Sequence, residues 1–122
     1  MANQTFLENS SNVYQYSGTY EGQGGYGEGA KNFLSFSNFG VLPKAVIVMP
    51  QENTTSAARG GFVVLNGVTS MRGGGLMDYT DNSQQLYFEW DEDNSTVYWY
   101  STKNNATQQN ISGVTYRYWA LF

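Results

Sequence analysis

The sequence contains no cysteine, no histidine and only two prolines among its 122 residues. Without cysteine the chain has neither disulfides nor thiolate metal ligands. Without histidine it lacks the most common general base, the histidine-dependent serine and cysteine triads, and the commonest zinc ligand. These absences argue against a catalytic site and a metal site, so we expect no enzymatic activity and no cofactor.

Charge is also scarce. Charged residues make up 13% of the chain, the net charge is −4, and the six Lys and Arg residues are scattered singly. A protein without a basic stripe cannot neutralise the phosphates of a nucleic acid, so nucleic-acid binding is not expected. No apolar run approaches the roughly 18 residues that a membrane-spanning helix needs, so membrane insertion is not expected either.

Aromatic residues, by contrast, are abundant. They reach 16% of the chain, ten of them are tyrosines, and most of the polar residues are Asn, Ser, Thr, Gln and Gly. This composition is typical of a strand-rich protein, because aromatic and β-branched side chains pack well on a pleated surface. A surface of amides, hydroxyls and tyrosines fits contact with sugars or with other proteins. It fits a neutral extracellular surface equally well.

Short apolar or alternating runs separated by turn signals predict strands along the chain. The predicted strands cover residues 12–20, 33–36, 44–49, 62–65, 84–90, 96–100 and 113–122. Seven or eight short strands without an amphipathic helix indicate an all-β fold, and we expect an antiparallel β-sandwich. We expect a single domain over residues 12–122, preceded by a polar lead-in segment over residues 1–11.

Several segments carry more specific expectations. The apolar run 45–48 lies between Pro43 and Pro50, which predicts a strand covered on both faces. The Asn-Gly pair at 66–67 is typical of a tight hairpin turn, and residues 72–75 predict a glycine turn. The last strand is apolar on both faces, which predicts either a buried central position or a subunit interface.

The tyrosines of the last third form the main candidate site. If residues 84–90 pair with 96–100 through an acidic turn, three tyrosines and a glutamate share the face opposite an apolar layer. Flat rings with hydroxyls can stack on a sugar ring and form hydrogen bonds with its edges. Alternatively, a second sheet or a neighbouring subunit covers these rings. The candidate ligand-binding residues are Tyr87, Glu89, Tyr98 and Tyr100, with Tyr26 and Arg72 from the glycine loops.

Three apparent motifs carry no chemistry in this context. Glu89 and Asp91 alternate onto one strand face, but at an exposed hairpin end they are expected to be solvated charges rather than a glycosidase pair. Residues 22–27 match G-x-G-x-x-G, yet no helix is predicted to follow and to hold a pyrophosphate. The acidic segment 91–95 begins like a calcium loop, but Thr96 stands where that loop needs glycine.

Two stretches resemble a known family. Residues 17–24 read S-G-T-Y-E-G-Q-G, followed by L-S-F at 34–36 and P-K-A-V-I-V at 43–48. Residues 110–120 read N-I-S-G-V-T-Y-R-Y-W-A. Together these are similar to the C-terminal domains of tail-fibre and baseplate proteins of phages and prophages of Gram-positive and gut bacteria. The similarity covers residues 14–121, and its motifs are turns and strands.

The resemblance implies a compact β-rich head, often trimeric, located where the virion touches its host. It implies no particular binding residue, and this chain departs from the family in being short. The resulting hypothesis is a non-enzymatic, lectin-like virion module that binds a host cell-surface polysaccharide and is extracellular after release. The alternative is a structural capsid or tail decoration protein without sugar binding, acting through protein interfaces built from Tyr116, Tyr118, Trp119 and Phe122.

Overall fold

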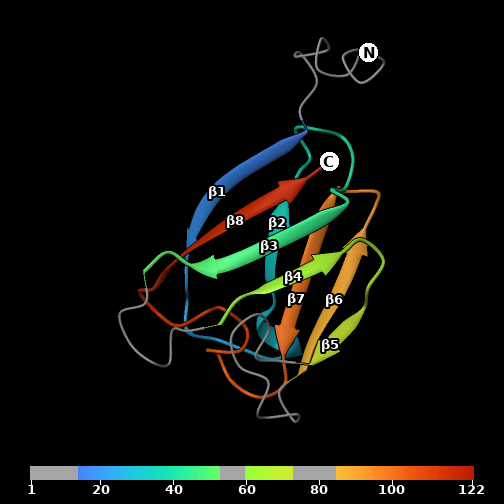
Figure 1. Ribbon diagram of the computed structural model, residues 1–122. Helices are drawn as coiled ribbons and strands as arrows, with labels where there is room; N and C mark the ends of the chain where they lie inside the picture. The colour runs from blue at the N-terminus through green and yellow to red at the C-terminus, as the bar shows by residue number, and fades with distance from the viewer. Residues whose placement is uncertain (1–13, 53–59, 73–84) are drawn as a thin grey trace, which may run out of the picture.

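The computed structural model describes residues 14–52, 60–72 and 85–122. They form two four-stranded antiparallel sheets that pack face to face (Figure 1). The first sheet has the strand order β1-β8-β3-β4, and the second has the order β2-β7-β6-β5. This architecture confirms the predicted all-β antiparallel sandwich. The predicted lead-in segment at residues 1–11 lies outside the described residues.

The described ranges contain eight strands, seven of which coincide with predicted segments to within a few residues. The strands are β1 (Gln15–Glu21), β2 (Asn32–Ser35), β3 (Ala45–Pro50), β4 (Phe62–Leu65), β5 (Ser70–Arg72), β6 (Gln85–Asp91), β7 (Thr96–Ser101) and β8 (Thr115–Leu121). The described residues also contain one 3-10 turn, η1 (Glu28–Ala30), at the end of the glycine loop, which comprises residues 22–29. Within these ranges, no helix is long and apolar enough to cross a membrane.

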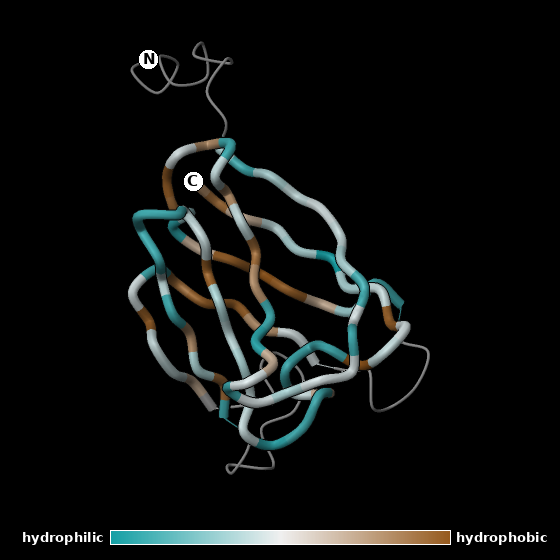
Figure 2. The backbone as a smooth tube through the Cα atoms, turned by 180° about the vertical axis from the view of Figure 1, so that it is seen from behind, coloured by the Kyte–Doolittle hydropathy of each residue, from teal (hydrophilic) through white to brown (hydrophobic). Residues whose placement is uncertain are grey.

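The core fills the space between the two sheets. Both sheets contribute alternate residues, and Figure 2 shows hydrophobic positions recurring along the strands while many loop positions are hydrophilic. At the centre, the Phe62 ring contacts Trp99 and Phe88 edge-on, with centroid distances of 5.3 and 5.2 Å. The buried core residues are Leu34, Phe36, Val46, Val48, Phe62, Val64, Leu86, Phe88, Val97, Trp99, Tyr116 and Ala120.

The last strand occupies the predicted central position. β8 pairs with β1 on one side and β3 on the other. The alternative set of interface residues is only partly compatible with this position, because Tyr116 is 1% exposed and cannot contact another subunit. Tyr118 and Phe122 are partly buried against the core. Of the four predicted interface residues, Trp119 alone lies on the outer face of the sheet.

In contrast to the prediction, the apolar run in β3 is not covered on both faces. Val46 and Val48 are buried, whereas Ile47 points to the outer face and is half-buried. The run is continuously apolar because the outer face of this sheet is itself apolar. There, Ile47 pairs with Val63 and Trp119, and Leu65 and Leu121 flank Ala45.

One turn prediction differs from the structure. Asn66 and Gly67 form a turn, with the Val68 N–H donating to the Leu65 carbonyl, but the turn does not close a hairpin. It carries the chain from β4 in one sheet to β5 in the other. The glycine turn predicted at 72–75 lies outside the described residues except for Arg72, which ends β5 and pairs with Gln85. β5 has three residues, too few to produce a recognisable period.

Two glycines in the N-terminal motif permit close approaches. A Cβ atom on Gly18 would lie 2.6 Å from the Tyr118 hydroxyl oxygen, so glycine makes room for that ring over β1. A Cβ atom on Gly22 would lie 2.0 Å from the Ile111 carbonyl oxygen. Gly22 also donates its N–H to the Val114 carbonyl at 2.8 Å, which fixes the two backbones side by side.

Gly22→Ala is therefore expected to lower the free energy of unfolding by about 1–3 kcal/mol, because the added methyl group meets a backbone oxygen that cannot rotate away. Urea unfolding would measure the change. Gly29→Ala is the matched control, since a Cβ there meets nothing within 4 Å. Equal stability of the two variants would contradict this steric explanation.

Candidate functional site

The predicted pairing of β6 with β7 places the candidate tyrosines on one face. Tyr87 pairs with Tyr100, and Glu89 pairs with Tyr98. The rings of Tyr87 and Tyr100 are stacked with centroids 5.2 Å apart, while Leu86, Phe88, Val97 and Trp99 lie in the core. This surface lies on the outer side of the second sheet and is not covered by the first sheet of the sandwich. We call it the tyrosine face, and it comprises Lys31, Phe33, Tyr87, Glu89, Tyr98 and Tyr100.

Two members of the tyrosine face were not predicted. Phe33 of β2 pairs with Tyr98, and their ring centroids lie 6.0 Å apart. Phe33 is 61% exposed, which is unusual for a large apolar side chain. Alternation in residues 33–36 placed Phe33 and Leu34 on opposite sides of a strand, but the sequence could not show which strand lies beside β7.

Lys31 is the second unpredicted member. Its Nζ atom lies 3.0 Å from the Glu89 carboxylate and 5.9 Å from the centroid of the Tyr100 ring. The hydrogen bond that Lys31 donates to the Glu89 carboxylate raises the pKa of the Lys31 ammonium. Burial, with contributions from Glu28, Tyr87 and Glu89, raises the pKa of the Tyr100 hydroxyl. The face thus combines aromatic rings with one balanced ion pair.

The remaining two candidate residues are less closely connected to this face. Tyr26 is 50% exposed on the loop that leads into η1, and no contact joins it to the tyrosine pair among the interactions described. Arg72 pairs with Gln85 at the end of β5, next to β6. Gln85 in turn accepts a hydrogen bond from the Tyr87 hydroxyl.

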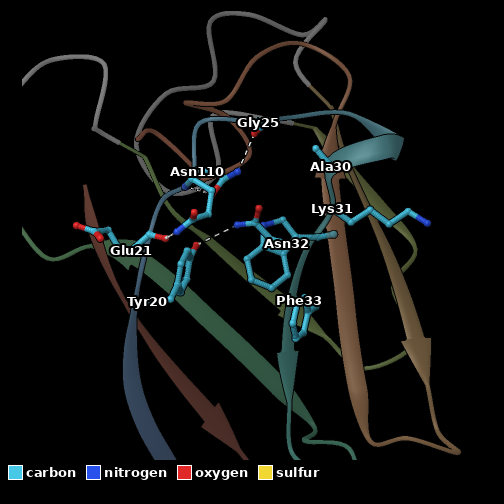
Figure 3. A pocket seen from close by; sticks show the side chains of 10 residues that line it. Tyr20, Glu21, Gly25, Ala30, Lys31, Asn32, Phe33 and Asn110 are labelled. Atoms are coloured by element: carbon cyan, nitrogen blue, oxygen red, sulfur yellow. Dashed lines mark hydrogen bonds between the residues drawn. The ribbon is translucent and has the colours of Figure 1, made fainter. Parts of the chain in front are cut away.

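A pocket opens beside the tyrosine face, between the edge strands β1 and β2 and under the glycine loop (Figure 3). Its volume is about 390 Å³, within the range of small-ligand sites. We call it the edge pocket. It is lined by Tyr20, Glu21, Gln23, Gly25, Ala30, Lys31, Asn32, Phe33, Trp99 and Asn110. This pocket was not predicted, because its walls come from four segments that are separate in the sequence.

Residues 104–111, which we call the amide loop, cover the edge pocket on the side of the glycine loop. The Gln108 side chain is fully buried, and its Oε1 accepts from the N–H groups of Gly27 and Ser101 at 2.9 and 2.8 Å. Its Nε2 donates to the Ala30 carbonyl at 2.7 Å and to Asn32 Oδ1 at 3.0 Å. One side chain therefore connects β7, the glycine loop and β2.

Asn110 holds the other side of the glycine loop. Its Oδ1 accepts from the Gln23 N–H, and its Nδ2 donates to the Gly25 carbonyl, both at 2.8 Å. The Tyr20 hydroxyl donates to the Gln109 carbonyl at 2.7 Å. The amides that line the edge pocket are thus engaged in the protein's own hydrogen bonds, and the walls are fixed before any ligand arrives.

The acidic turn between β6 and β7 makes its own hydrogen bonds. The Asp91 carboxylate accepts from the Asn94 backbone N–H at 3.2 Å and from its Nδ2 at 2.8 Å. In the part of the chain that the structure describes, no three acidic residues come close enough to hold a metal ion. Glu89 faces Lys31 and Tyr98 rather than a second carboxylate.

Comparison with known proteins found no matching family model, no matching curated protein and no matching solved structure. The similarity to phage tail-fibre domains therefore rests on the sequence motifs alone.

The Tyr20 phenol gives a test of the pocket wall. Burial raises its pKa well above the usual value, the adjacent Tyr116 adds to the shift, and a hydrogen bond from Asn32 opposes it. Above about pH 10 an unfolded tyrosine ionises while Tyr20 in the folded protein stays protonated, so the free energy of unfolding falls as pH rises. We expect a shallower fall in Tyr20→Phe, measured by urea unfolding at pH 8 and pH 11. An identical pH dependence in both proteins would show that Tyr20 is not protected.

Proposed function

We propose that this chain is a non-enzymatic module that binds a host cell-surface glycan through the tyrosine face. The stacked pair Tyr87 and Tyr100, on an uncovered sheet face beside Tyr98 and the exposed Phe33, is the observation that supports this proposal. Apolar faces of sugar rings stack on such rings, while the phenol hydroxyls and Glu89 offer hydrogen bonds to sugar hydroxyls.

The setting we propose is a phage virion, at the tip of a tail fibre or baseplate. The resemblance of residues 14–121 to tail-fibre domains supports this setting, as does a surface rich in amides and tyrosines and poor in charge. A shallow aromatic face binds sugar weakly. Several copies on one particle, such as a trimer, would strengthen binding because the second and third contacts become intramolecular.

A second candidate function is structural, with the chain holding virion proteins together. The supporting observation is an aliphatic face on the outer side of the first sheet, where Leu65 is 59% exposed, Val63 40% and Leu121 39%. Ile47 and Trp119 complete this face through the strand pairings. Aliphatic side chains offer sugars no hydrogen bonds, so the fitting occupant is another apolar protein surface, and a second copy of this chain carries one.

The first test concerns the tyrosine face. Purified protein should bind, saturably, one or more isolated polysaccharides from a panel of Gram-positive and gut bacterial cell walls. Tyr87→Ala/Tyr100→Ala should weaken that binding roughly tenfold or more, because two stacking rings are lost. Tyr87→Phe/Tyr100→Phe is the matched control, which keeps the rings and should retain most of the binding. Full binding by the alanine pair, with its circular dichroism spectrum unchanged, would rule out this face.

The second test concerns the aliphatic face. If copies associate through it, Leu65→Asp should reduce the mass measured by light scattering toward the 13.6 kDa of one chain, because a charge would be buried in the interface. Ser70→Asp is the control, since it adds the same charge to an exposed position on the other sheet. A wild-type protein that stays monomeric at high concentration would contradict self-association.

A further inference from the structure

We propose that the edge pocket takes the acetamido group of an N-acetylated amino sugar, while the rest of the glycan extends across Phe33 onto the tyrosine face. This inference rests on the proposed function and specifies its ligand class. It depends on three features of the pocket: its continuity with the tyrosine face, the small number of polar groups that remain free inside it, and its position between two edge strands.

The pocket and the tyrosine face share side chains. Phe33 and Lys31 line the pocket and also belong to the tyrosine face. On that face, Phe33 contacts Tyr98 and Lys31 contacts Glu89. Figure 3 shows Lys31 directed away from the opening, while Tyr20 and Asn32 project into the gap between the two strands. A ligand lying on the exposed Phe33 ring can therefore reach the pocket with one substituent.

The interior of the pocket favours an apolar group. Its walls include the rings of Tyr20, Trp99 and Phe33. The Asn32 Nδ2 donates to the carbonyls of Gln108 and Gln109, and its Oδ1 accepts from Gln108, so little hydrogen-bonding capacity remains for a ligand. A sugar hydroxyl placed against Asn32 and the three rings would lose water and gain few partners, whereas a methyl group would lose no hydrogen bond.

The flanking strands favour an amide next to that methyl group. β1 and β2 lie at the edges of their sheets, since β1 pairs with β8 and β2 with β7. Edge strands present backbone N–H and C=O groups that are not used within the sheet. An acetamido group has the chemistry of a peptide unit, one donor and one acceptor in a plane, so it can pair with such an edge while its methyl group enters the aromatic pocket.

The test uses two tetrasaccharides with the same β-1,4 linkage that differ at the 2-position. Chitotetraose carries acetamido groups there and cellotetraose carries hydroxyls. Isothermal titration should give at least tenfold tighter binding of chitotetraose to the wild-type protein. Titration of ¹⁵N-labelled protein with free N-acetylglucosamine should shift the amide signals of Ala30, Asn32 and Asn110, and glucose should leave them in place.

Ala30→Leu fills the pocket and should bring the two tetrasaccharide affinities within about twofold of each other. Gly29→Leu is the matched control, because it adds the same side chain at a neighbouring position where a Cβ meets nothing within 4 Å, and it should keep the preference. Tyr87→Ala/Tyr100→Ala should instead weaken both tetrasaccharides alike. These three patterns together would support the assignment of the pocket.

Two outcomes separate this inference from the proposed function. Equal binding of both tetrasaccharides, or no shift of pocket amides with N-acetylglucosamine, would overturn the acetamido assignment even if wall polysaccharides still bind the tyrosine face. A pocket response to N-acetylglucosamine, with chitotetraose binding unchanged in Tyr87→Ala/Tyr100→Ala, would support the pocket and count against the tyrosine face as the main binding surface.

Discussion

The Gln108 side chain makes four hydrogen bonds while fully buried, to backbone groups of Gly27, Ala30 and Ser101 and to the Asn32 side chain. A buried amide that satisfies all its donors and acceptors in one arrangement excludes other arrangements, because each alternative leaves a polar group without a partner. The glycine loop, the start of β2 and the end of β7 are therefore held in one relative position. The edge pocket and the exposed position of Phe33 both depend on it.

The sequence was sufficient for the parts of the fold that follow from local pattern. Alternation in 84–90 and 96–100 predicted which tyrosines share a face, since side-chain direction in a strand depends only on parity. It could not show that β2 lies beside β7, or that Asn66 and Gly67 link two sheets, because strand order depends on contacts between distant segments. The amide loop was not recognised for the same reason. Nothing in the local pattern distinguishes its glutamines and asparagines from exposed polar side chains, because their partners lie in distant segments.

The two outer faces of the sandwich have opposite chemistries. The face of the second sheet carries phenols, Phe33 and one ion pair, whereas that of the first carries Ile47, Val63, Leu65 and Leu121. The core, to which both sheets contribute, separates the two faces, so an outward-facing substitution on one sheet makes no direct contact with the other outer face. The sugar-binding and structural proposals are therefore compatible in one molecule, and each is assigned to a surface that can be altered alone.

The pairing of β1 with β8 has a mechanical consequence. Gln15 lies opposite Leu121, and the Phe122 N–H donates to the Tyr14 carbonyl at 2.9 Å, so the described chain enters and leaves the sandwich at the same corner (Figure 1). A force pulling these two ends apart would act across the strands and open their hydrogen bonds one pair at a time, like a zipper. A force that reached the domain through its two outer faces would instead act across the core, on the packing between the sheets rather than on the hydrogen bonds within each sheet.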